Sequence, residues 1–273
     1  MSPAAGILLA DKPAGISSHD VVARARRALG ERRIGHAGTL DPFATGLLIL
    51  LVGPATRLQR FFMALPKTYE VTAKLGASSS TGDPEGEITD SGVFPSEPIT
   101  LPLGKIRQRP PAYSAVKVDG ERAYARARRG ETVVLAEREV EIHDWEILWR
   151  EGDRVGLRIA CSSGTYIRSL ISDLADAYCL ELRRTAIGPF TLENAWPTQG
   201  PAALVDVLTA CRQFAPSISL DDTEAALLRG GQPVPTSAGA PLVLATDAGG
   251  APIALAERRE SEAGATLRPI VAA

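Results

Sequence analysis

The chain of 273 residues is poor in the side chains that most often bind metals or act as nucleophiles, with only three cysteines and three histidines. No histidine stands at ligand spacing from another histidine or from a cysteine. The cysteines, Cys161, Cys179 and Cys211, are odd in number and share no metal-like spacing, which argues against a disulfide framework. We therefore expect no bound metal, and thiols that are structural and reduced.

Long apolar runs are missing as well. No segment has eighteen consecutive apolar residues, so no part of the chain is expected to span a membrane. The N-terminal stretch MSPAAGILLADKPAG has no basic residue ahead of its apolar run, which is interrupted at Asp11, and so differs from a signal peptide. These features predict a cytoplasmic protein.

The signature motifs of several enzyme classes are also absent. The sequence contains no Walker loop, HExxH, GxGxxG or GxSxG. This removes most of the support for a nucleotide cofactor, a metallohydrolase or a serine hydrolase, and no cofactor is expected.

The net charge of −2 conceals an uneven distribution. Residues 104–138 hold nine basic and four acidic residues, and residues 22–35 hold five arginines and one glutamate. From Asp221 onward the balance reverses, with seven acidic residues and four arginines. Basic surface can attract a polyanion even on a slightly acidic protein, although the same arginines are equally compatible with solvated helix faces.

The first half of the chain indicates a strand at residues 7–10 and a helix that is capped by Ser17 or Ser18 and ends at Gly30. LLILLVG, residues 47–53, is apolar enough for a strand buried on both faces. Residues 67–77 alternate like a half-buried strand, with Tyr69 and Val71 on one face.

Further along, two strands are predicted around a turn at Gly152-Asp153. Residues 165–179 have the apolar spacing of one helix, which extends to Tyr178, and residues 181–192 return as a strand. The order of elements predicts an α+β fold with a mixed, largely antiparallel sheet flanked by helices.

Two domains are predicted, over residues 1–212 and 213–273. Within the first, residues 104–138 combine prolines, a hairpin turn at Asp119-Gly120 and a short basic helix over 121–129, which favours a protruding insertion. After Pro216 small residues, prolines and short alternating strands favour a small β-rich domain.

One aspartate stands out. In GHAGTLDPFATGLLIL, residues 35–50, Asp41 lies between small residues and an apolar run. A single carboxylate suits nucleophilic or electrostatic catalysis better than glycoside hydrolysis, which normally uses a pair. The same turn is also typical of an aspartate that bonds to its own downstream backbone, and the local pattern leaves both interpretations open.

Six segments occur in a fixed order: DKPAGISSHD, GHAGTLDPFATGLL, KTYEV, PPAYSAVKVDGERAYARARRG, SSGTYIRSLISDL and LRRTAIGPF. Together they closely resemble the TruB family of tRNA pseudouridine synthases, which isomerise uridine 55 in the TΨC arm. The resemblance covers residues 6–192, and a weaker one links residues 218–271 to the family's small PUA-like C-terminal domain. It implies the pseudouridine-synthase fold, an isomerase without metal or cofactor, and the T-arm of tRNA as partner.

The resemblance implies catalytic roles for Asp41, Tyr69 and Arg168. Pseudouridine formation breaks the N1–C1′ bond and rejoins the base through C5, and a carboxylate can attack the base or the sugar or stabilise cationic charge at C1′. Tyr69, which would otherwise be read as a core residue, would stack on the flipped uracil and assist proton transfer. Arg168 would pair with Asp41 and keep it ionised and oriented.

The resemblance also implies substrate contacts. His36 would fill space vacated by flipped nucleotides without acting as a base, and Lys12 would support the pocket or reach backbone phosphates. Tyr166 and Leu182 would line the uracil pocket. Residues 104–138 match the thumb that closes over the T-arm, whose cations would contact phosphates: Lys117, Arg122, Arg126, Arg128 and Arg129.

Small residues before Asp41, namely Gly35, Ala37 and Gly38, would let a nucleotide approach the backbone. The chain departs from the family between Tyr166 and Leu182, where it is shorter and lacks a Gly-Ala-His-like stretch near the pocket.

Two other functions stay open beside a monomeric enzyme that needs no protein partner. One is an RNA-folding chaperone with incidental catalysis. The other is the catalytic subunit of a guide-RNA particle, which the compact length disfavours.

Overall fold

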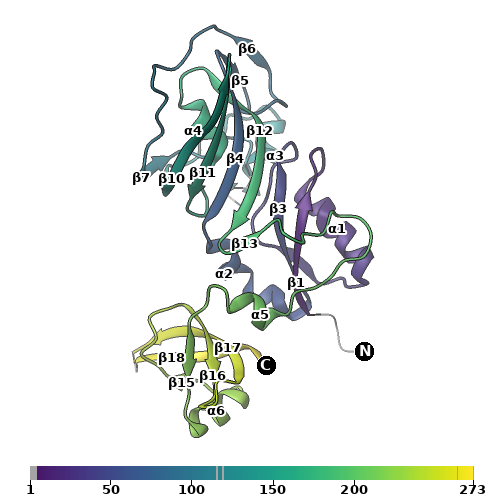
Figure 1. Ribbon diagram of the computed structural model, residues 1–273, viewed down its shortest axis with the longest axis vertical. Helices are drawn as coiled ribbons and strands as arrows, with labels where there is room; N and C mark the ends of the chain where they lie inside the picture. The colour runs from purple at the N-terminus through teal and green to yellow at the C-terminus, as the bar shows by residue number, and fades with distance from the viewer. Residues whose placement is uncertain (1–4, 115, 119, 263, 273) are drawn as a thin grey trace.

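The computed structural model describes residues 5–114, 116–118, 120–262 and 264–272. Its main part is a nine-stranded sheet, seen in the upper half of Figure 1. The strands are β1 (Gly6–Lys12), β2 (Ile34–His36), β3 (Thr45–Val52), β4 (Lys67–Leu75), β7 (Gly104–Gln108), β10 (Arg138–Glu151), β11 (Arg154–Cys161), β12 (Ala177–Ile187) and β13 (Phe190–Thr191). Two small hairpins pair β5 (Ala77–Ser79) with β6 (Ile88–Asp90) and β8 (Lys117–Val118) with β9 (Glu121–Arg122).

The order of the sheet is β1-β3-β12-β4-β11-β10-β7, with β2 beside β3 and β13 beside β12. The described pairs are antiparallel apart from β3 with β12, where Arg184 lies opposite Gly46. Gly46 has a φ of 105°, and a Cβ there would lie 2.2 Å from the carbonyl oxygen of Arg184, so only glycine fits. The prediction of a mixed, largely antiparallel sheet is confirmed.

Helices cover this sheet and connect its strands: α1 (Ser18–Leu29), the 3₁₀-helix η1 (Gly53–Leu58), α2 (Gln59–Ala64), α3 (Ala123–Arg128), α4 (Ile167–Ser172) and α5 (Val207–Cys211). As predicted, α1 begins after Ser17, which forms a capping box with Asp20, and ends at Gly30 in the left-handed conformation. The predicted strand pattern at residues 67–77 is confirmed by β4, in which every second side chain is buried.

The single helix predicted over residues 165–179 is wrong. The helix α4 ends at Ser172, Ala175 has a positive φ of 76°, and Tyr178 already belongs to β12. Pairing of Ala177–Cys179 with β4 satisfies their backbone groups in the sheet, and this tertiary contact overrides the helical spacing.

The protruding insertion is shorter than predicted. Residues 104–108 form β7, which pairs with the start of β10 in the main sheet. The part outside the sheet, residues 109–137, holds β8, β9 and α3 and is called the lobe below.

A second sheet with five strands lies at the bottom of Figure 1. Its elements are β14 (Ser217–Ser219), α6 (Asp222–Arg229), β15 (Val234–Pro235), β16 (Leu242–Thr246), β17 (Pro252–Ser261) and β18 (Gly264–Ala272). Leu242, Leu244 and Leu255 of this sheet share a buried cluster with Phe62 of α2 and with the segment after α5. The two sheets are therefore joined by a continuous apolar contact, and a PUA-like C-terminal domain stays a prediction.

None of the helices in the described part of the chain has the length and apolar character needed to cross a bilayer. Cys161, Cys179 and Cys211 are all buried and free. Burial raises the pKa of Cys161 to about 11 and that of Cys211 to about 12, and it raises the pKa of Cys179 further.

Candidate active site

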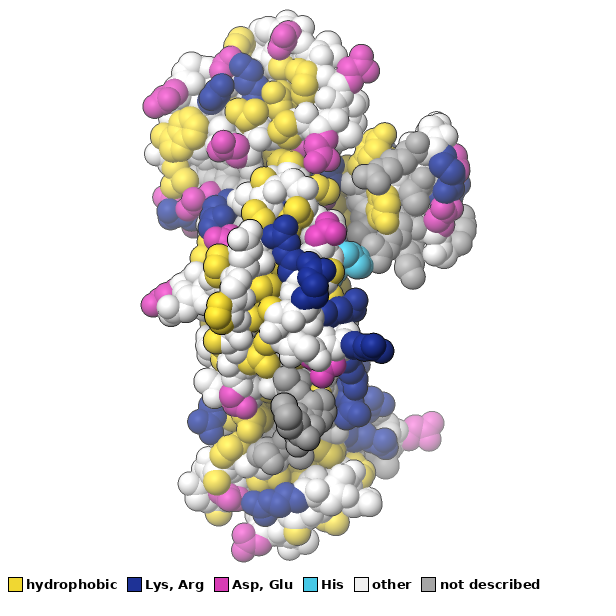
Figure 2. Space-filling view, turned by 90° about the vertical axis from the view of Figure 1, so that its right-hand side faces the viewer, with side chains coloured by type: hydrophobic (Ala, Val, Ile, Leu, Met, Phe, Trp, Pro, Cys, Tyr) yellow, Lys and Arg dark blue, Asp and Glu magenta, His cyan; other side chains and the backbone are white. Residues whose placement is uncertain are grey.

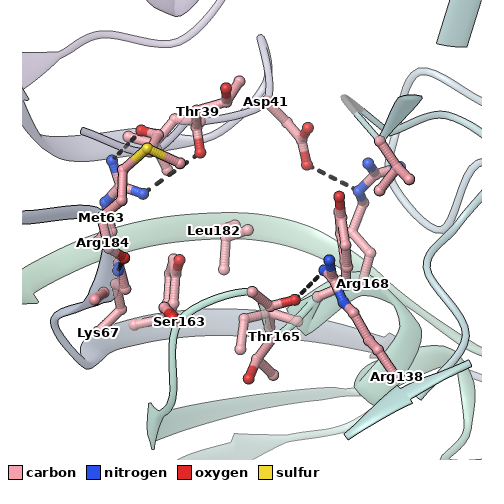
Figure 3. A pocket seen from close by; sticks show the side chains of 18 of the residues that line it. Thr39, Asp41, Met63, Lys67, Arg138, Ser163, Thr165, Arg168, Leu182 and Arg184 are labelled. Carbon is pink, nitrogen blue, oxygen red and sulfur yellow. Dashed lines mark hydrogen bonds and ion pairs between the residues drawn. The ribbon is translucent and has the colours of Figure 1, made fainter. Parts of the chain in front are cut away.

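A cavity of about 620 Å³ opens where β4 and β12 meet the segment between β2 and β3 (Figure 3). Its lining includes Asp41, Tyr69, Tyr166, Arg168 and Leu182, which come from four separate segments of the chain. The structure thus brings the three predicted catalytic residues and two of the predicted substrate contacts to one place. A volume of this size is typical of a small-molecule or nucleotide pocket.

Asp41 lies in a short segment, residues 37–44, called the Asp41 loop. On one side Ser18 exchanges hydrogen bonds with the backbone of Leu40, at 2.9 and 3.1 Å. On the other side the guanidinium of Arg184, which is 1% exposed, donates to the carbonyls of Gly38 and Thr39. Buried donors therefore fix the loop from two directions, and the carboxylate is preorganised.

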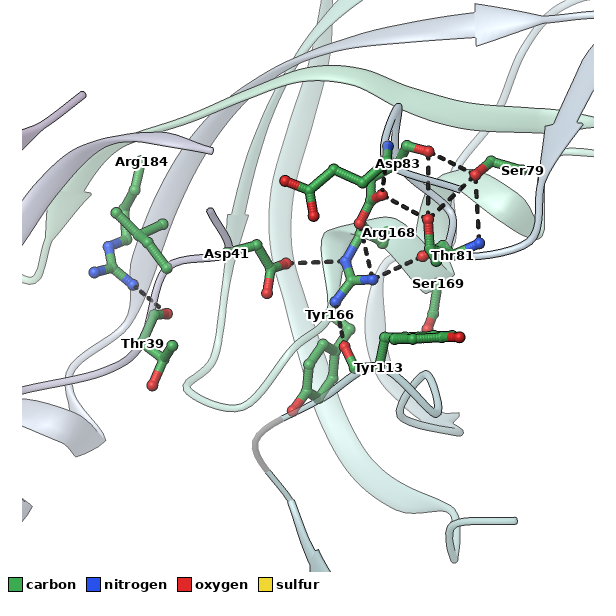
Figure 4. Close-up of polar contacts among 12 residues, drawn as sticks. Thr39, Asp41, Ser79, Thr81, Asp83, Tyr113, Tyr166, Arg168, Ser169 and Arg184 are labelled. Atoms are coloured by element: carbon green, nitrogen blue, oxygen red, sulfur yellow. Dashed lines mark hydrogen bonds and ion pairs between the residues drawn. The ribbon is translucent and has the colours of Figure 1, made fainter. Parts of the chain in front are cut away.

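Arg168 binds the Asp41 carboxylate on the side away from Arg184, as Figure 4 shows. Its Nε lies 2.9 Å from Asp41 Oδ2, and its Nη1 lies 3.1 Å from Oδ2 of Asp83. The remaining edge of the guanidinium donates to the carbonyls of Thr81 and Tyr113, both at 2.7 Å. Arg168 is 3% exposed, and its charge is balanced by two carboxylates while two carbonyls accept its remaining donors.

Only one oxygen of the Asp41 carboxylate is used in this way. Within the described residues no group bonds Oδ1, and Asp41 lines the cavity. Burial raises the pKa of Asp41, an effect that the Arg168 guanidinium opposes and the nearby Asp83 carboxylate reinforces. The result is an oriented carboxylate in the cavity wall, with one oxygen that no described residue bonds.

Asp83 was missed by sequence reasoning, although it is 4% exposed and shares Arg168 with Asp41. It sits in the polar segment SSSTGDPEGEI, which reads as a flexible loop. Its carboxylate also accepts from the Thr81 hydroxyl and from the Glu85 backbone. Nothing in the local pattern marks this aspartate as buried, because its partner Arg168 is far away in the sequence.

Lys12 lies outside the cavity lining, and of its two expected roles its contacts agree with support of the pocket and not with a phosphate contact. Its side chain is fully buried, and its ammonium donates to the carbonyls of Pro13, Ile16 and Pro42. Burial lowers its pKa to about 8, while the Asp41 carboxylate opposes that shift. Lys12 supports the Asp41 loop from below and has no donor left for a phosphate.

Tyr69 and Leu182 form the floor of the cavity, with 8% and 7% of their surface exposed. Burial raises the pKa of Tyr69, and the nearby Arg184 guanidinium opposes this shift. At neutral pH the phenol therefore stays protonated, so it can stack on a ring or donate a hydrogen bond but is a poor base.

Arg184 and Lys67 also line the cavity, and sequence reasoning assigned no role to either of them. Arg184 donates through Nε to Leu47 and through its other nitrogens to the Asp41 loop. Lys67 is 6% exposed and donates to the carbonyls of Met63 and Leu65, and burial lowers its pKa to about 8. A charged residue inside a predicted strand, as in KTYEV or LRRTAIGPF, was the available signal.

His36 ends β2 outside the cavity lining, and its ring meets that of His19 edge-on with 5.4 Å between centroids. The expected access through small residues is only partly supported. Gly38 lines the cavity and needs its glycine for a φ of 105°, whereas Ala37 is fully buried in the core and Gly35 lies beside Gln59. Ala37 therefore packs inward and gives no room to a nucleotide.

The lobe carries the basic residues that were predicted to contact phosphates. The side chains of Lys117, Arg122 and Arg128 lie outside the described part of the chain. Arg129 is paired with both Glu121 and Glu131, and Arg126 with Glu131. These arginines are exposed or half-buried, and acids of the same lobe balance them.

No group of three or more His, Cys, Asp or Glu side chains in the described ranges is arranged to hold a metal ion. The described site therefore combines one oriented carboxylate, a protonated phenol and a floor formed by the buried side chains of Tyr69 and Leu182.

Comparison with known proteins identifies the family of the chain. Residues 26–167, more than half of the chain, match the family described as TruB family pseudouridylate synthase, N-terminal domain. The chain belongs to the TruB family of pseudouridylate synthases. It is similar to tRNA pseudouridine synthase B of Arthrobacter sp. (strain FB24), with 42% identity over 257 residues that cover 86% of this chain and 84% of the relative. The protein of the same name from Thermobifida fusca (strain YX) is 50% identical over 212 residues, 70% of this chain and 72% of the relative.

Solved structures give the same TruB-type fold. A chain in the crystal structure of a Cbf5-Nop10-Gar1 complex is 26% identical, with a TM-score of 0.64 over 92% of this chain and 78% of that chain. A chain in the archaeal box H/ACA sRNP Nop10-Cbf5 complex has a TM-score of 0.66 at 22% identity, over 98% of this chain and 85% of that chain. The second likeness concerns the fold alone.

Proposed function

We propose that this pseudouridylate synthase isomerises uridine 55 in the TΨC arm of tRNA, with Asp41 as the catalytic carboxylate. The observation that carries the proposal is the Asp41 carboxylate in the cavity wall, with Oδ2 paired to a buried arginine and Oδ1 bonded by no described residue. The relatives named tRNA pseudouridine synthase B supply the substrate class.

The reaction conserves all atoms of the substrate. The N1–C1′ bond breaks, the uracil turns within the cavity, a C5–C1′ bond forms, and the proton on C5 leaves while N1 gains one. In this proposal Oδ1 of Asp41 attacks the base or the sugar, or stabilises positive charge at C1′. Tyr69 would stack on the uracil and donate a hydrogen bond, and the apolar side of Leu182 would cover the ring.

Reaching a uridine inside the T-loop requires base flipping, which costs a few kcal/mol. Contacts between cations and phosphates are the expected compensation. Figure 2 shows Lys and Arg side chains gathered in a band across one face of the molecule, beside a histidine. Exposed arginines of α1, the turn after it and η1 add such cations: Arg26, Arg27, Arg32, Arg33 and Arg57. For His36 and the lobe arginines, a role in RNA contact remains part of this proposal.

Tritium release from tRNA transcripts labelled with 5-tritiated uridine tests the proposal. Wild-type protein should release tritium from a transcript with uridine 55 and from a bare T-arm hairpin, and none from position 55 when it is cytidine. Release that does not depend on uridine 55 would contradict the site assignment. Activity of the isolated chain on the hairpin would exclude a need for guide RNA or protein partners.

Asp41→Asn tests the catalytic residue. Activity should fall about a thousandfold or more, because the reacting oxygen is replaced by an amide nitrogen or a neutral oxygen. Asp83 remains as the counter-ion of Arg168, so the fold and tRNA binding should be kept. Unchanged isomerisation would refute the assignment, and an RNA chaperone would keep tRNA folding activity in this variant.

A further inference from the structure

Five basic side chains line the cavity that contains Asp41. Four of them already bond or pair with other groups of the protein. Arg168 bonds two carboxylates and two carbonyls, and Arg184 bonds three carbonyls. Lys67 donates to two carbonyls, and Arg60 pairs with Glu257 and lies over the Phe61 ring. These four therefore hold the structure of the pocket.

Arg138, the fifth, is different. Its Nη2 donates to the carbonyl of Gly164, and its guanidinium lies 4.8 Å from the centre of the Tyr166 ring. Its Nε is buried without a hydrogen-bond partner, and no carboxylate among the described residues pairs with it. The acids on either side of it in the sequence are engaged elsewhere, Glu137 with Arg107 and Arg109 and Glu139 with Lys105.

The position of Arg138 in the cavity indicates what it meets. The floor is made by buried Tyr69 and Leu182, which suit a neutral ring. Arg138 is only half-buried and lies beside exposed Gly164, so it belongs to the mouth. When a base enters a pocket, its phosphates stay near the solvent, and a guanidinium with free N–H groups is a strong phosphate donor.

Arg138 is also held in place. It is the first residue of β10 and pairs in the sheet with Gln108. Gln108 in turn exchanges two hydrogen bonds with the backbone of Tyr166, at 2.8 and 2.9 Å. The ring under the guanidinium and the strand that carries it are thus fixed to each other, which lowers the entropy lost when a phosphate binds.

We propose that Arg138 binds a backbone phosphate of the flipped nucleotide at the mouth of the cavity, using the Tyr166 ring as its support. This inference rests on the proposed function, because the RNA that supplies the phosphate is the substrate. It assigns Arg138 to substrate binding and leaves the chemical step to Asp41.

The test is the salt dependence of binding to a fluorescent T-arm hairpin by the full chain. Loss of one phosphate contact should make the slope of log affinity against log salt shallower by about 0.7 in Arg138→Gln. Affinity at low salt should fall about tenfold, and kcat at saturating RNA should stay within about threefold of wild type. Arg138→Lys keeps a charge and should keep the wild-type slope.

Arg158→Gln is the matched control. Arg158 is exposed on β11, pairs with Glu146, and points to the opposite face from Tyr69, so its loss should leave the slope unchanged. A wild-type slope in Arg138→Gln would overturn the proposal. So would equal loss of kcat in the Gln and Lys variants at unchanged affinity, because that result identifies a residue that only positions Tyr166. Failure of the wild type to modify uridine 55 would contradict the proposed function and still leave the slopes measurable.

Discussion

The arginines beside the cavity and those of the lobe carry the same guanidinium group in opposite surroundings. Arg168 and Arg184 are buried and bonded to fixed carbonyls and carboxylates. Arg126 and Arg129 pair with acids only a few residues away, at the surface. A buried guanidinium cannot exchange its partners without leaving donors unsatisfied, whereas a surface one exchanges them with water, salt or phosphate. The first pair therefore sets the geometry of the site, and under the proposed function the second pair would exchange its glutamates for RNA phosphates.

The largest difference in stability and activity is expected between a methionine substitution at a buried arginine of the site and the same substitution at a surface arginine of the lobe. Arg168→Met leaves Asp41 and Asp83 buried without their cation, so unfolding free energy should drop by about 3–5 kcal/mol. Pseudouridine formation should fall at least about a hundredfold, because the carboxylate loses its orientation. Arg129→Met should leave the melting temperature unchanged within error. Urea unfolding and tritium release measure both, and equal stability loss in the two variants would erase the distinction.

Arg184→Met should have the next largest effect. Three carbonyls, including those of Gly38 and Thr39, would lose a buried charged donor, at a cost of about 2–4 kcal/mol. The Asp41 loop would then be held from the Ser18 side alone, so kcat should fall about 10- to 100-fold with KM nearly unchanged. A change confined to KM would show that Arg184 contacts the substrate instead of the loop.

The pH profile tests the same buried network. Burial raises the pKa of Asp41, so the ionised, active form is lost as pH falls through a value above the ordinary aspartate range near about 3.9. In Asp83→Asn a neighbouring negative charge is removed, the pKa of Asp41 drops, and the acid limb of kcat should move to lower pH. Glu85→Gln, an exposed acid on the same loop, is the control and should not move it. A shift to higher pH in Asp83→Asn would mean that losing the Arg168 anchor dominates.

The smallest effect is expected in the lobe. A double Arg126→Gln, Arg129→Gln variant should raise KM about two- to fivefold at low salt, with kcat unchanged, because each arginine must leave a glutamate to reach a phosphate. The difference from wild type should disappear at high salt. Steady-state kinetics at two salt concentrations measure it, and a salt-independent loss of kcat would place these arginines in the active site.

The sequence predicted correctly those features that depend on residues close to one another in the chain. The capping box of α1 and the alternation of β4 could be read directly, because caps and period-two burial depend on residues close in sequence. The long helix after Tyr166 was wrong, since pairing of Ala177 with Leu75 lies outside any local window. Asp41, Tyr69 and Arg168 were found through the family motifs and not through spacing.

The residues that sequence reasoning missed share a cause. Asp83 and Arg184 are buried polar groups whose partners lie tens of residues away, so only the folded chain shows that they are enclosed. The sequence left two roles open for Lys12 for the same reason, because an exposed lysine at a strand end and a buried one look alike in the sequence. Arg138 bonds one carbonyl and, within the described residues, no carboxylate, which only the folded chain shows.

The buried thiols have a practical consequence for watching the lobe at work. Because Cys161, Cys179 and Cys211 are enclosed and their pKa values are raised, almost none of their sulfur is present as reactive thiolate at neutral pH. Toward a maleimide dye the native protein should behave as if it had no cysteine. A cysteine that replaces exposed Thr132, shortly after α3, would then take up the dye alone and report on the lobe without removal of a native cysteine.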